Sequence, residues 1–134
     1  MVCSSSLLVE NKSITVLYLC ITLTQKYRSN NFIQSMILEV AILHVKKNQE
    51  IEFERDFVFA GKYISSTTGY IRHSLQKCVE QSNKYLLLVE WNKLEDHTVG
   101  FRESDAYKDW KRLLHHYYDP FPIVEHFEMI FTNP

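Results

Sequence analysis

Histidine is the side chain in this sequence with the widest range of chemistry, and the chain has six of them. An imidazole titrates near neutral pH, so it can exchange a proton, and in its neutral form it binds metals. The six histidines form no H-E-x-x-H motif. The nearest approach to a set of two histidines and one carboxylate is His116, Asp119 and His126, which lacks the usual spacing. The sequence therefore predicts no metal site.

Other familiar catalytic motifs are missing from the sequence as well. The chain has no G-x-S-x-G nucleophile elbow. Its three glycines lie too far apart to form a G-x-G-x-x-G turn or a P-loop, so no nucleotide cofactor is expected. The three cysteines are an odd number at wide spacing, which predicts neither a disulfide framework nor a thiolate zinc site. A reducing cytoplasm is the expected location.

Aromatic side chains recur at helical spacing in the last third of the chain. Tyr107, Trp110 and Tyr117 share one face of a helix that Ser104 is suited to cap. Such a stripe can hold a flat aromatic ligand, and it can equally well fill a protein core. His115 and His116 lie near the end of this helix, where a cation is favourable even without a catalytic role.

The surrounding pattern predicts the elements that must position these side chains. A helix capped by Asn48 should bury Phe53, Phe57, Ala60 and Ile64. Strands are predicted at residues 37–45, 70–79, 85–91 and 123–131. With the helix that begins at Ser104, the order is βαββαβ. This is the ferredoxin-like α+β class, a four-stranded antiparallel sheet with helices on one face.

The third predicted strand has apolar side chains on both of its faces, because residues 85–89 read Tyr-Leu-Leu-Leu-Val. A strand of this kind is normally buried on both sides. The helices of a βαββαβ unit cover only one face of the sheet, so a second copy of the chain is the simplest cover for the other. The sequence therefore predicts a homodimer.

Residues 1–35 differ in composition from the rest, and we expect them to be an extension outside the folded domain of residues 36–134. Their apolar run, residues 14–23, is shorter than the roughly 20 residues of a membrane-spanning helix, and no basic segment precedes it as in a signal peptide. The formal net charge of −1, with acidic and basic residues well mixed, argues against nucleic-acid or anionic-membrane partners.

Several segments of the predicted domain resemble one known family. They are Gly69-Tyr70-Ile71-Arg72-His73, the strand Tyr85-Leu86-Leu87-Leu88-Val89-Glu90-Trp91, His97 six residues further on, and Ser104-Asp105-Ala106-Tyr107 before Trp110. Over residues 36–131 the chain resembles the antibiotic biosynthesis monooxygenase family of dimeric α+β-barrel proteins. The resemblance implies a pocket between sheet and helices, in which phenolic or quinol-type aromatics are oxidised with O₂ without a metal or flavin.

The resemblance also implies which residues form that pocket. His97 would be the catalytic base, with His115 as a second candidate. Arg72 and His73 are neighbours on one strand and point to opposite faces, so only one of them can face the pocket. Each of these side chains also has an ordinary structural role open to it, as core or cap. The candidates for substrate binding are Trp91, Arg72, His73, Phe101, Tyr107 and Trp110.

Two alternatives to this activity follow from the same pattern. Some members of the family degrade haem with a His in the last long helix and an Asn on the first strand. Here Lys111 lies near the first of these positions and residues 37–45 contain no Asn, which argues against that branch. The second alternative is a non-catalytic dimeric protein that binds a hydrophobic or aromatic ligand in the same pocket, because a fold alone does not fix an activity.

Overall fold

A computed structural model of the protein describes residues 36–134, so the predicted extension 1–35 lies outside the described residues. The four strands are β1 (Ile37–His44), β2 (Tyr70–Lys77), β3 (Lys84–Trp91) and β4 (Val124–Glu128). The helices are α2 (Glu50–Ser65) and α3 (Asp105–Leu114), with the short helical turns η1 (Asp96–Phe101) and η2 (His115–Tyr117). This order confirms the predicted ferredoxin-like α+β fold.

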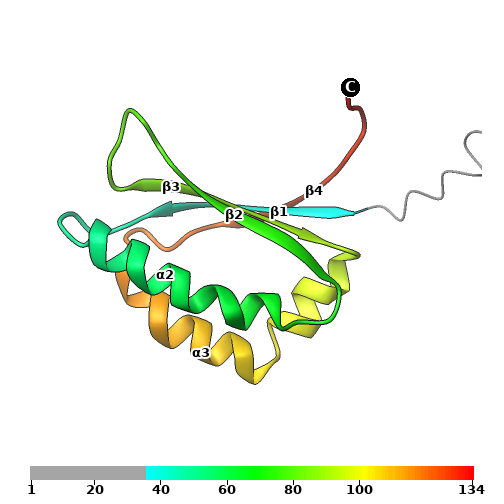
Figure 1. The fold of residues 1–134 in the computed structure, drawn as a ribbon, viewed down its shortest axis with the longest axis horizontal. Coiled ribbons are helices and arrows are strands. Elements are labelled where there is room, and N and C mark those ends of the chain that lie inside the picture. Colours follow the sequence, from blue (N-terminus) through cyan, green and yellow to red (C-terminus); the bar gives the residue numbers. More distant parts are fainter. Residues whose placement is uncertain (1–35) are drawn as a thin grey trace, which may run out of the picture. The chain divides into compact units, whose positions relative to one another are not determined.

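The sheet is antiparallel throughout, with the strand order β2-β3-β1-β4. Both α2 and α3 lie against the same face of this sheet (Figure 1). Strand β1 is therefore central, flanked by β3 and β4 and covered by helices on one side. Side chains of β1 that point toward the helices lie in the middle of the domain.

The core forms between the sheet and the two helices. Along β1 the buried side chains alternate with more exposed ones, as expected for a strand with one covered face. Helix α2 buries the four residues predicted from its spacing, Phe53, Phe57, Ala60 and Ile64. Helix α3 begins where predicted, because the Ser104 hydroxyl accepts a hydrogen bond from the backbone N–H of Tyr107 at 3.1 Å.

The predicted cap of the first helix was wrong. Asn48 adopts a left-handed backbone conformation, with φ of 67°, and Gln49 occupies the cap position without a side-chain hydrogen bond. Asparagine is one of the few residues that tolerate this conformation, so Asn48 forms the turn before the helix.

The aromatic stripe also ends differently from the prediction, because α3 stops at Leu114 and Tyr117 belongs to the turn η2. The backbone carbonyl of Tyr117 accepts a hydrogen bond from the N–H of Lys46 at 2.8 Å, and Tyr118 forms a bridge with Val45. Because residues 117 and 118 make these contacts with the end of β1, they cannot continue the hydrogen-bond pattern of helix α3. Contacts between distant segments of this kind cannot be read from helical spacing.

The face of the sheet opposite the helices is apolar. Leu86 and Leu88 of β3 are only half-buried there, and Ile42 of β1 and Phe127 of β4 are 45% and 48% exposed. This agrees with the apolar character of both faces that the sequence of β3 indicated. No helix within residues 36–134 is long and apolar enough to cross a membrane.

Candidate functional site

A cavity of about 170 Å³ lies between the sheet and the helix layer. Its floor is formed by apolar side chains of the sheet, including Ala41, Leu43 and Leu87. Aromatic rings from η1, α3 and the segment after η2 form much of the remaining wall. The polar side chains on the wall are Glu39, His97, Arg102, Tyr107 and His115.

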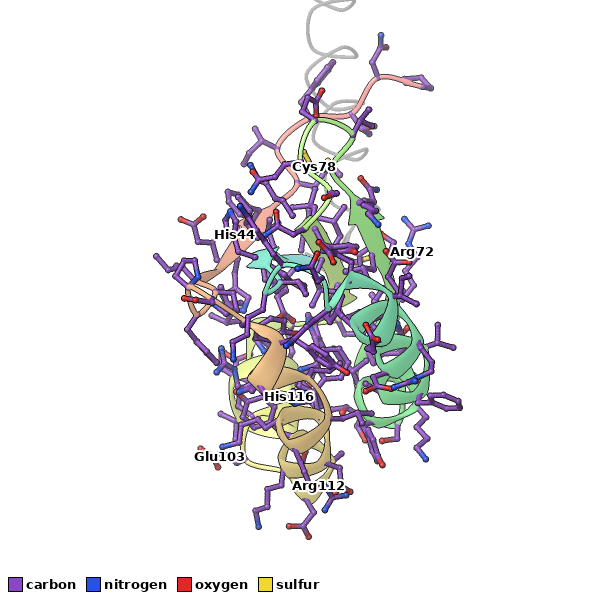
Figure 2. The ribbon with its side chains drawn as sticks, turned by 90° about the vertical axis from the view of Figure 1, so that its left-hand side faces the viewer. His44, Arg72, Cys78, Glu103, Arg112 and His116 are labelled. Carbon is purple, nitrogen blue, oxygen red and sulfur yellow. The ribbon has the colours of Figure 1, made fainter. Side chains whose placement is uncertain are left out.

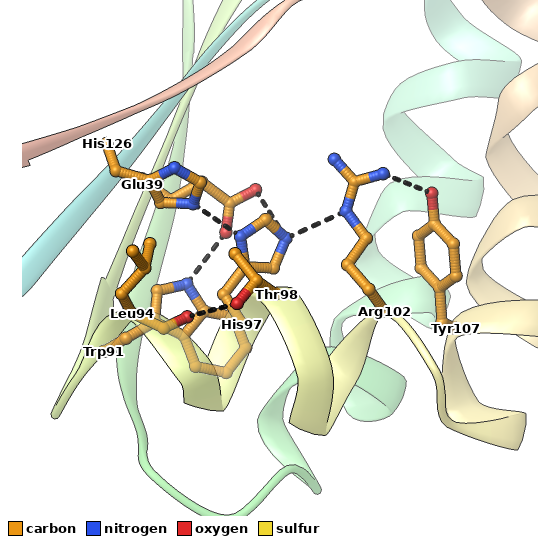
Figure 3. Close-up of polar contacts among 8 residues, drawn as sticks. All are labelled: Glu39, Trp91, Leu94, His97, Thr98, Arg102, Tyr107 and His126. Carbon is orange, nitrogen blue, oxygen red and sulfur yellow. Dashed lines mark hydrogen bonds and ion pairs between the residues drawn. The ribbon is translucent and has the colours of Figure 1, made fainter.

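Glu39 is a carboxyl group within the core, because it occupies a helix-facing position of the central strand β1. Glu39 is only 5% exposed to solvent. One carboxyl oxygen, Oε2, accepts a hydrogen bond from the indole N–H of Trp91 at 2.8 Å. The other, Oε1, lies 3.5 Å from His97 Nε2 (Figure 3). Glu39 is therefore a buried carboxyl group whose two contacts within the core are an indole N–H and an imidazole.

His97 connects Glu39 to two further side chains. The residue is 2% exposed, on the single π-helical turn η1, and its ring stacks on Trp91. Its Nδ1 lies 2.7 Å from His126 Nε2, and its Nε2 accepts a hydrogen bond from Arg102 Nε at 3.3 Å (Figure 3). Because the guanidinium can only donate, Nε2 must carry the lone pair and Nδ1 the hydrogen, which is donated to His126.

Arg102 completes the network at the cavity wall. Arg102 is the residue that directly follows η1. Its guanidinium donates a second hydrogen bond, from Nη1, to the Tyr107 hydroxyl at 3.0 Å. The guanidinium carbon also lies 5.3 Å from the centre of the Tyr107 ring. The chain from Glu39 through His97 and Arg102 to Tyr107 therefore spans β1, η1 and α3.

The electrostatics of this cluster keep most of its members neutral at pH 7. Burial raises the pKa of Glu39 to about 7, against the opposing effects of the Trp91 hydrogen bond and the Arg102 charge. Burial, together with the Arg102 charge and His126, lowers the pKa of His97 to about 3. Burial also lowers the pKa of His115 to about 4. Glu39 is thus the group of the cluster that changes charge near neutral pH.

Five of the eight side chains singled out from the sequence line this cavity. They come from η1, α3 and η2, and they are His97, Phe101, Tyr107, Trp110 and His115.

The other three lie elsewhere in the domain. Trp91 is fully buried behind Glu39 and His97 and contacts them rather than the cavity. His73 faces α2, where Tyr70 Oη lies 2.6 Å from its Nδ1. Arg72, on the edge strand β2 (Figure 2), forms an ion pair with Glu90 at 2.6 Å. It points to the opposite face of the sheet from its neighbour His73, which pairs with the buried Val89.

Sequence reasoning missed Glu39, Arg102 and His126. A signal for Glu39 was present, because residue 39 shares the period-two register of Ile37, Ala41 and Leu43, which all point to the core. A carboxylate in that register has to be buried. Arg102 and His126 gave no comparable signal, since their neighbours in space come from other elements. Within residues 36–134 no group of three or more His, Cys, Asp or Glu side chains is arranged to hold a metal ion.

This fold and this cavity define a ferredoxin-like α+β domain with a small internal site between sheet and helices. The family model described as "antibiotic biosynthesis monooxygenase" matches residues 36–113. The chain is also 58% identical, over 93 residues, to the uncharacterized protein YczJ of Bacillus subtilis (strain 168), covering 69% of this chain and 98% of that relative. The chain therefore belongs to the antibiotic biosynthesis monooxygenase family.

Solved structures with the same fold include a Bordetella bronchiseptica protein that carries the same family name. It superposes with a TM-score of 0.70 at 27% identity, over 72% of this chain and 99% of that one. A mutant of SnoaB, a cofactor-independent oxygenase from Streptomyces nogalater, superposes with a TM-score of 0.66 at 17% identity, over 75% of this chain and 98% of that one. At that identity the second match shows the shared fold alone.

Proposed function

We propose that this protein is an oxygenase that oxidises a small phenolic or quinol-type aromatic with O₂, without a metal or flavin. The observation that carries the proposal is the contact between Glu39, whose pKa is about 7, and neutral His97 at an aromatic-lined cavity. Membership of the monooxygenase family supports the same activity, as does the likeness in fold to an oxygenase described as cofactor-independent.

The chemistry needs a proton acceptor more than any other catalytic group. A phenol has an ordinary pKa near 10, so it is neutral at pH 7 and a poor electron donor. Once ionised, the ring can pass one electron to O₂, and the ring radical and superoxide can combine through a new C–O bond. Loss of the ring proton with cleavage of the O–O bond then leaves one oxygen as a carbonyl. The other oxygen leaves as water, which takes up both protons.

His97 and Glu39 act as one unit in this scheme. His97 alone is a weak base, because its pKa is about 3. When Glu39 is ionised, its carboxylate stabilises the imidazolium that forms as His97 Nε2 exchanges its hydrogen bond from Arg102 for the phenol proton. The imidazolium in turn stabilises the phenolate beside it, while Phe101 and Trp110 hold the ring.

We also propose that the working form is a homodimer in which the apolar faces of two sheets pack together. Ile42 and Phe127, which are about half exposed on this face, support the proposal, as does the half-buried side of β3.

The test is O₂ uptake with a panel of phenols and quinols. We expect His97→Ala to lower turnover roughly 10²- to 10⁴-fold, the usual contribution of a general base, and His97→Gln to be similarly slow. His116→Gln is the matched control, because His116 is exposed and does not line the cavity, and it should keep full activity.

Two results would contradict the proposal in different ways. Tight binding of phenols with no O₂ uptake above the uncatalysed rate would favour the non-catalytic binding protein. Full activity of His97→Ala on a confirmed substrate would move the base elsewhere, and His115, the other histidine of the cavity wall, would be the next residue to replace.

A further inference from the structure

The cavity has an unusual balance of charge for a site that holds so many ionisable side chains. Glu39 is largely protonated below pH 7, and His97 and His115 are neutral there because their pKa values are lowered to about 3 and about 4. A guanidinium is always charged in a protein. Below pH 7, Arg102, an exposed residue that lines the cavity, is therefore the side chain of the cavity wall that carries a full charge.

Arg102 also has no ionic partner among residues 36–134. Its two hydrogen bonds go to neutral acceptors, the ring nitrogen of His97 and the hydroxyl of Tyr107. The ion pairs of the described part of the chain include each of the other arginines, for example Arg72 with Glu90 and Arg112 with Asp109, but not Arg102. Its second terminal nitrogen has no contact with the residues drawn in Figure 3. A guanidinium carries more N–H donors than two contacts use, so an anion can still bind it.

The volume of the cavity limits the size of the ligand that can carry this anionic group. An engineered cavity of about 150 Å³ binds benzene, and this cavity measures about 170 Å³. A single aromatic ring therefore fits, whereas fused ring systems require the walls to move. The neighbouring positive charge of Arg102 also disfavours a metal cation beside His97, which lies 3.3 Å away.

We propose that the cavity binds a single-ring aromatic carboxylate, with Arg102 as the counter-ion of the carboxylate and the ring against Phe101 and Trp110. This proposal deepens the proposed oxygenase function and rests on it for the fate of the ligand. It places the carboxylate at the Arg102 side and leaves the rest of the ring to face the Glu39–His97 pair.

Calorimetry on the full chain at pH 6 tests the proposal with three probes. They are 4-hydroxybenzoate, its neutral amide 4-hydroxybenzamide, and the two-ring 6-hydroxy-2-naphthoate. We expect the benzoate to bind roughly 10- to 100-fold more tightly than the amide, the range for hydrogen bonds to a charged group, and more tightly than the naphthoate. Equal affinity for benzoate and amide would overturn the proposal, and tighter binding of the naphthoate would overturn its single-ring part.

Variants at Arg102 separate a specific counter-ion from general surface charge. Arg102→Gln should abolish the preference for benzoate over amide, and Arg102→Lys should retain part of it. Arg112→Gln removes an exposed arginine of α3 (Figure 2) and should leave the preference unchanged. A preference that survives in Arg102→Gln, in a variant that keeps the wild-type circular dichroism spectrum, would overturn the assignment.

Oxygen uptake then distinguishes this proposal from the oxygenase function. Preferential binding of the benzoate without turnover of any phenol would leave the anion site standing and refute the oxygenase. Turnover of neutral phenols with no preference for carboxylates would do the reverse.

Discussion

Glu39 is held in the core because buried and exposed side chains alternate along β1. The free energy of unfolding therefore depends on whether Glu39 is protonated. Its pKa is about 7 in the folded protein against 4.5 for an ordinary glutamate. Between these two pH values the folded chain keeps a proton that the unfolded chain has lost, so the stability contributed by this group falls as pH rises. The histidines of lowered pKa act in the opposite direction at acidic pH.

Glu39→Gln isolates this contribution. Glutamine can still accept the Trp91 N–H and donate to His97, but it does not titrate. We expect the free energy of unfolding of Glu39→Gln minus that of the wild type to rise by about 3 kcal/mol between pH 4.5 and pH 8. Urea unfolding of both proteins across this pH range measures the difference. The contribution of the histidines with lowered pKa values is present in both proteins, so it cancels in the difference. A difference that does not change with pH would contradict the raised pKa.

Residue types alone identified about half of this site. His97 and the aromatic residues of α3 were found because their types and spacing are distinctive, and Phe101, Tyr107, Trp110 and His115 do line the cavity. Trp91 and His73 were candidates as well, but Trp91 is fully buried behind the cavity and His73 faces α2, so neither lines the cavity wall. Whether a core side chain reaches a cavity depends on its neighbours in three dimensions, and a single sequence does not contain that information.

The order of the elements, in contrast, followed from local patterns. Period-two and helical spacing gave the strands and helices to within a few residues, because each element has one face against the core. The errors lie at element ends, at Asn48 and after Leu114, where turn conformation and long-range hydrogen bonds decide.

Gly69 is the point where the connection between α2 and β2 meets η1. It has a φ of +86°, and a side chain at this position would overlap the Asp96 carboxyl group. Asp96 begins η1 and directly precedes His97. A side chain at position 69 would therefore displace Asp96 and, through it, the neighbouring His97.

Gly69→Ala should lower the free energy of unfolding by at least about 1–2 kcal/mol, the cost of a left-handed conformation for an L-residue, and should lower O₂ uptake as well. Gly100→Ala is the matched control, because a methyl group there meets its nearest neighbours at 3.7 Å and the helical backbone favours alanine. Urea unfolding measures both. A Gly69→Ala protein as stable as Gly100→Ala would refute the steric argument.

At the scale of the whole molecule, the apolar sheet face is the feature that the βαββαβ unit leaves uncovered. Leu88 lies on this face, opposite Val40 in the β1–β3 register. We expect light scattering to show a dimer at micromolar concentration and Leu88→Lys to shift it to monomer, because a charge buried between two sheets is costly.

Val58→Lys is the control for this change, since Val58 is exposed on α2, on the other side of the domain. It should remain a dimer. A wild-type monomer, or a Leu88→Lys protein that still dimerises, would contradict sheet-to-sheet packing.

The extension at residues 1–35 should be dispensable for folding, because the described residues 36–134 already contain the complete βαββαβ unit. The Bacillus subtilis relative is matched over 98% of its length by 93 residues of this chain, so a chain of about that length suffices for a family member. We expect a protein that lacks residues 1–35 to keep the melting temperature and oligomeric state of the full chain. A markedly lower melting temperature would mean that the extension packs on the domain.

The contact between Trp91 and Glu39 gives the protein an optical consequence of its buried carboxyl group. The indole N–H donates directly to the carboxyl, so ionisation of Glu39 places a full negative charge 2.8 Å from the fluorophore. In a Trp110→Phe protein, Trp91 is the remaining tryptophan of the two in the chain. Its emission should change with a midpoint near pH 7, and adding Glu39→Gln should remove that change. Ligands that shift the midpoint would then reveal, without any turnover, whether they compete for the proton that Glu39 holds.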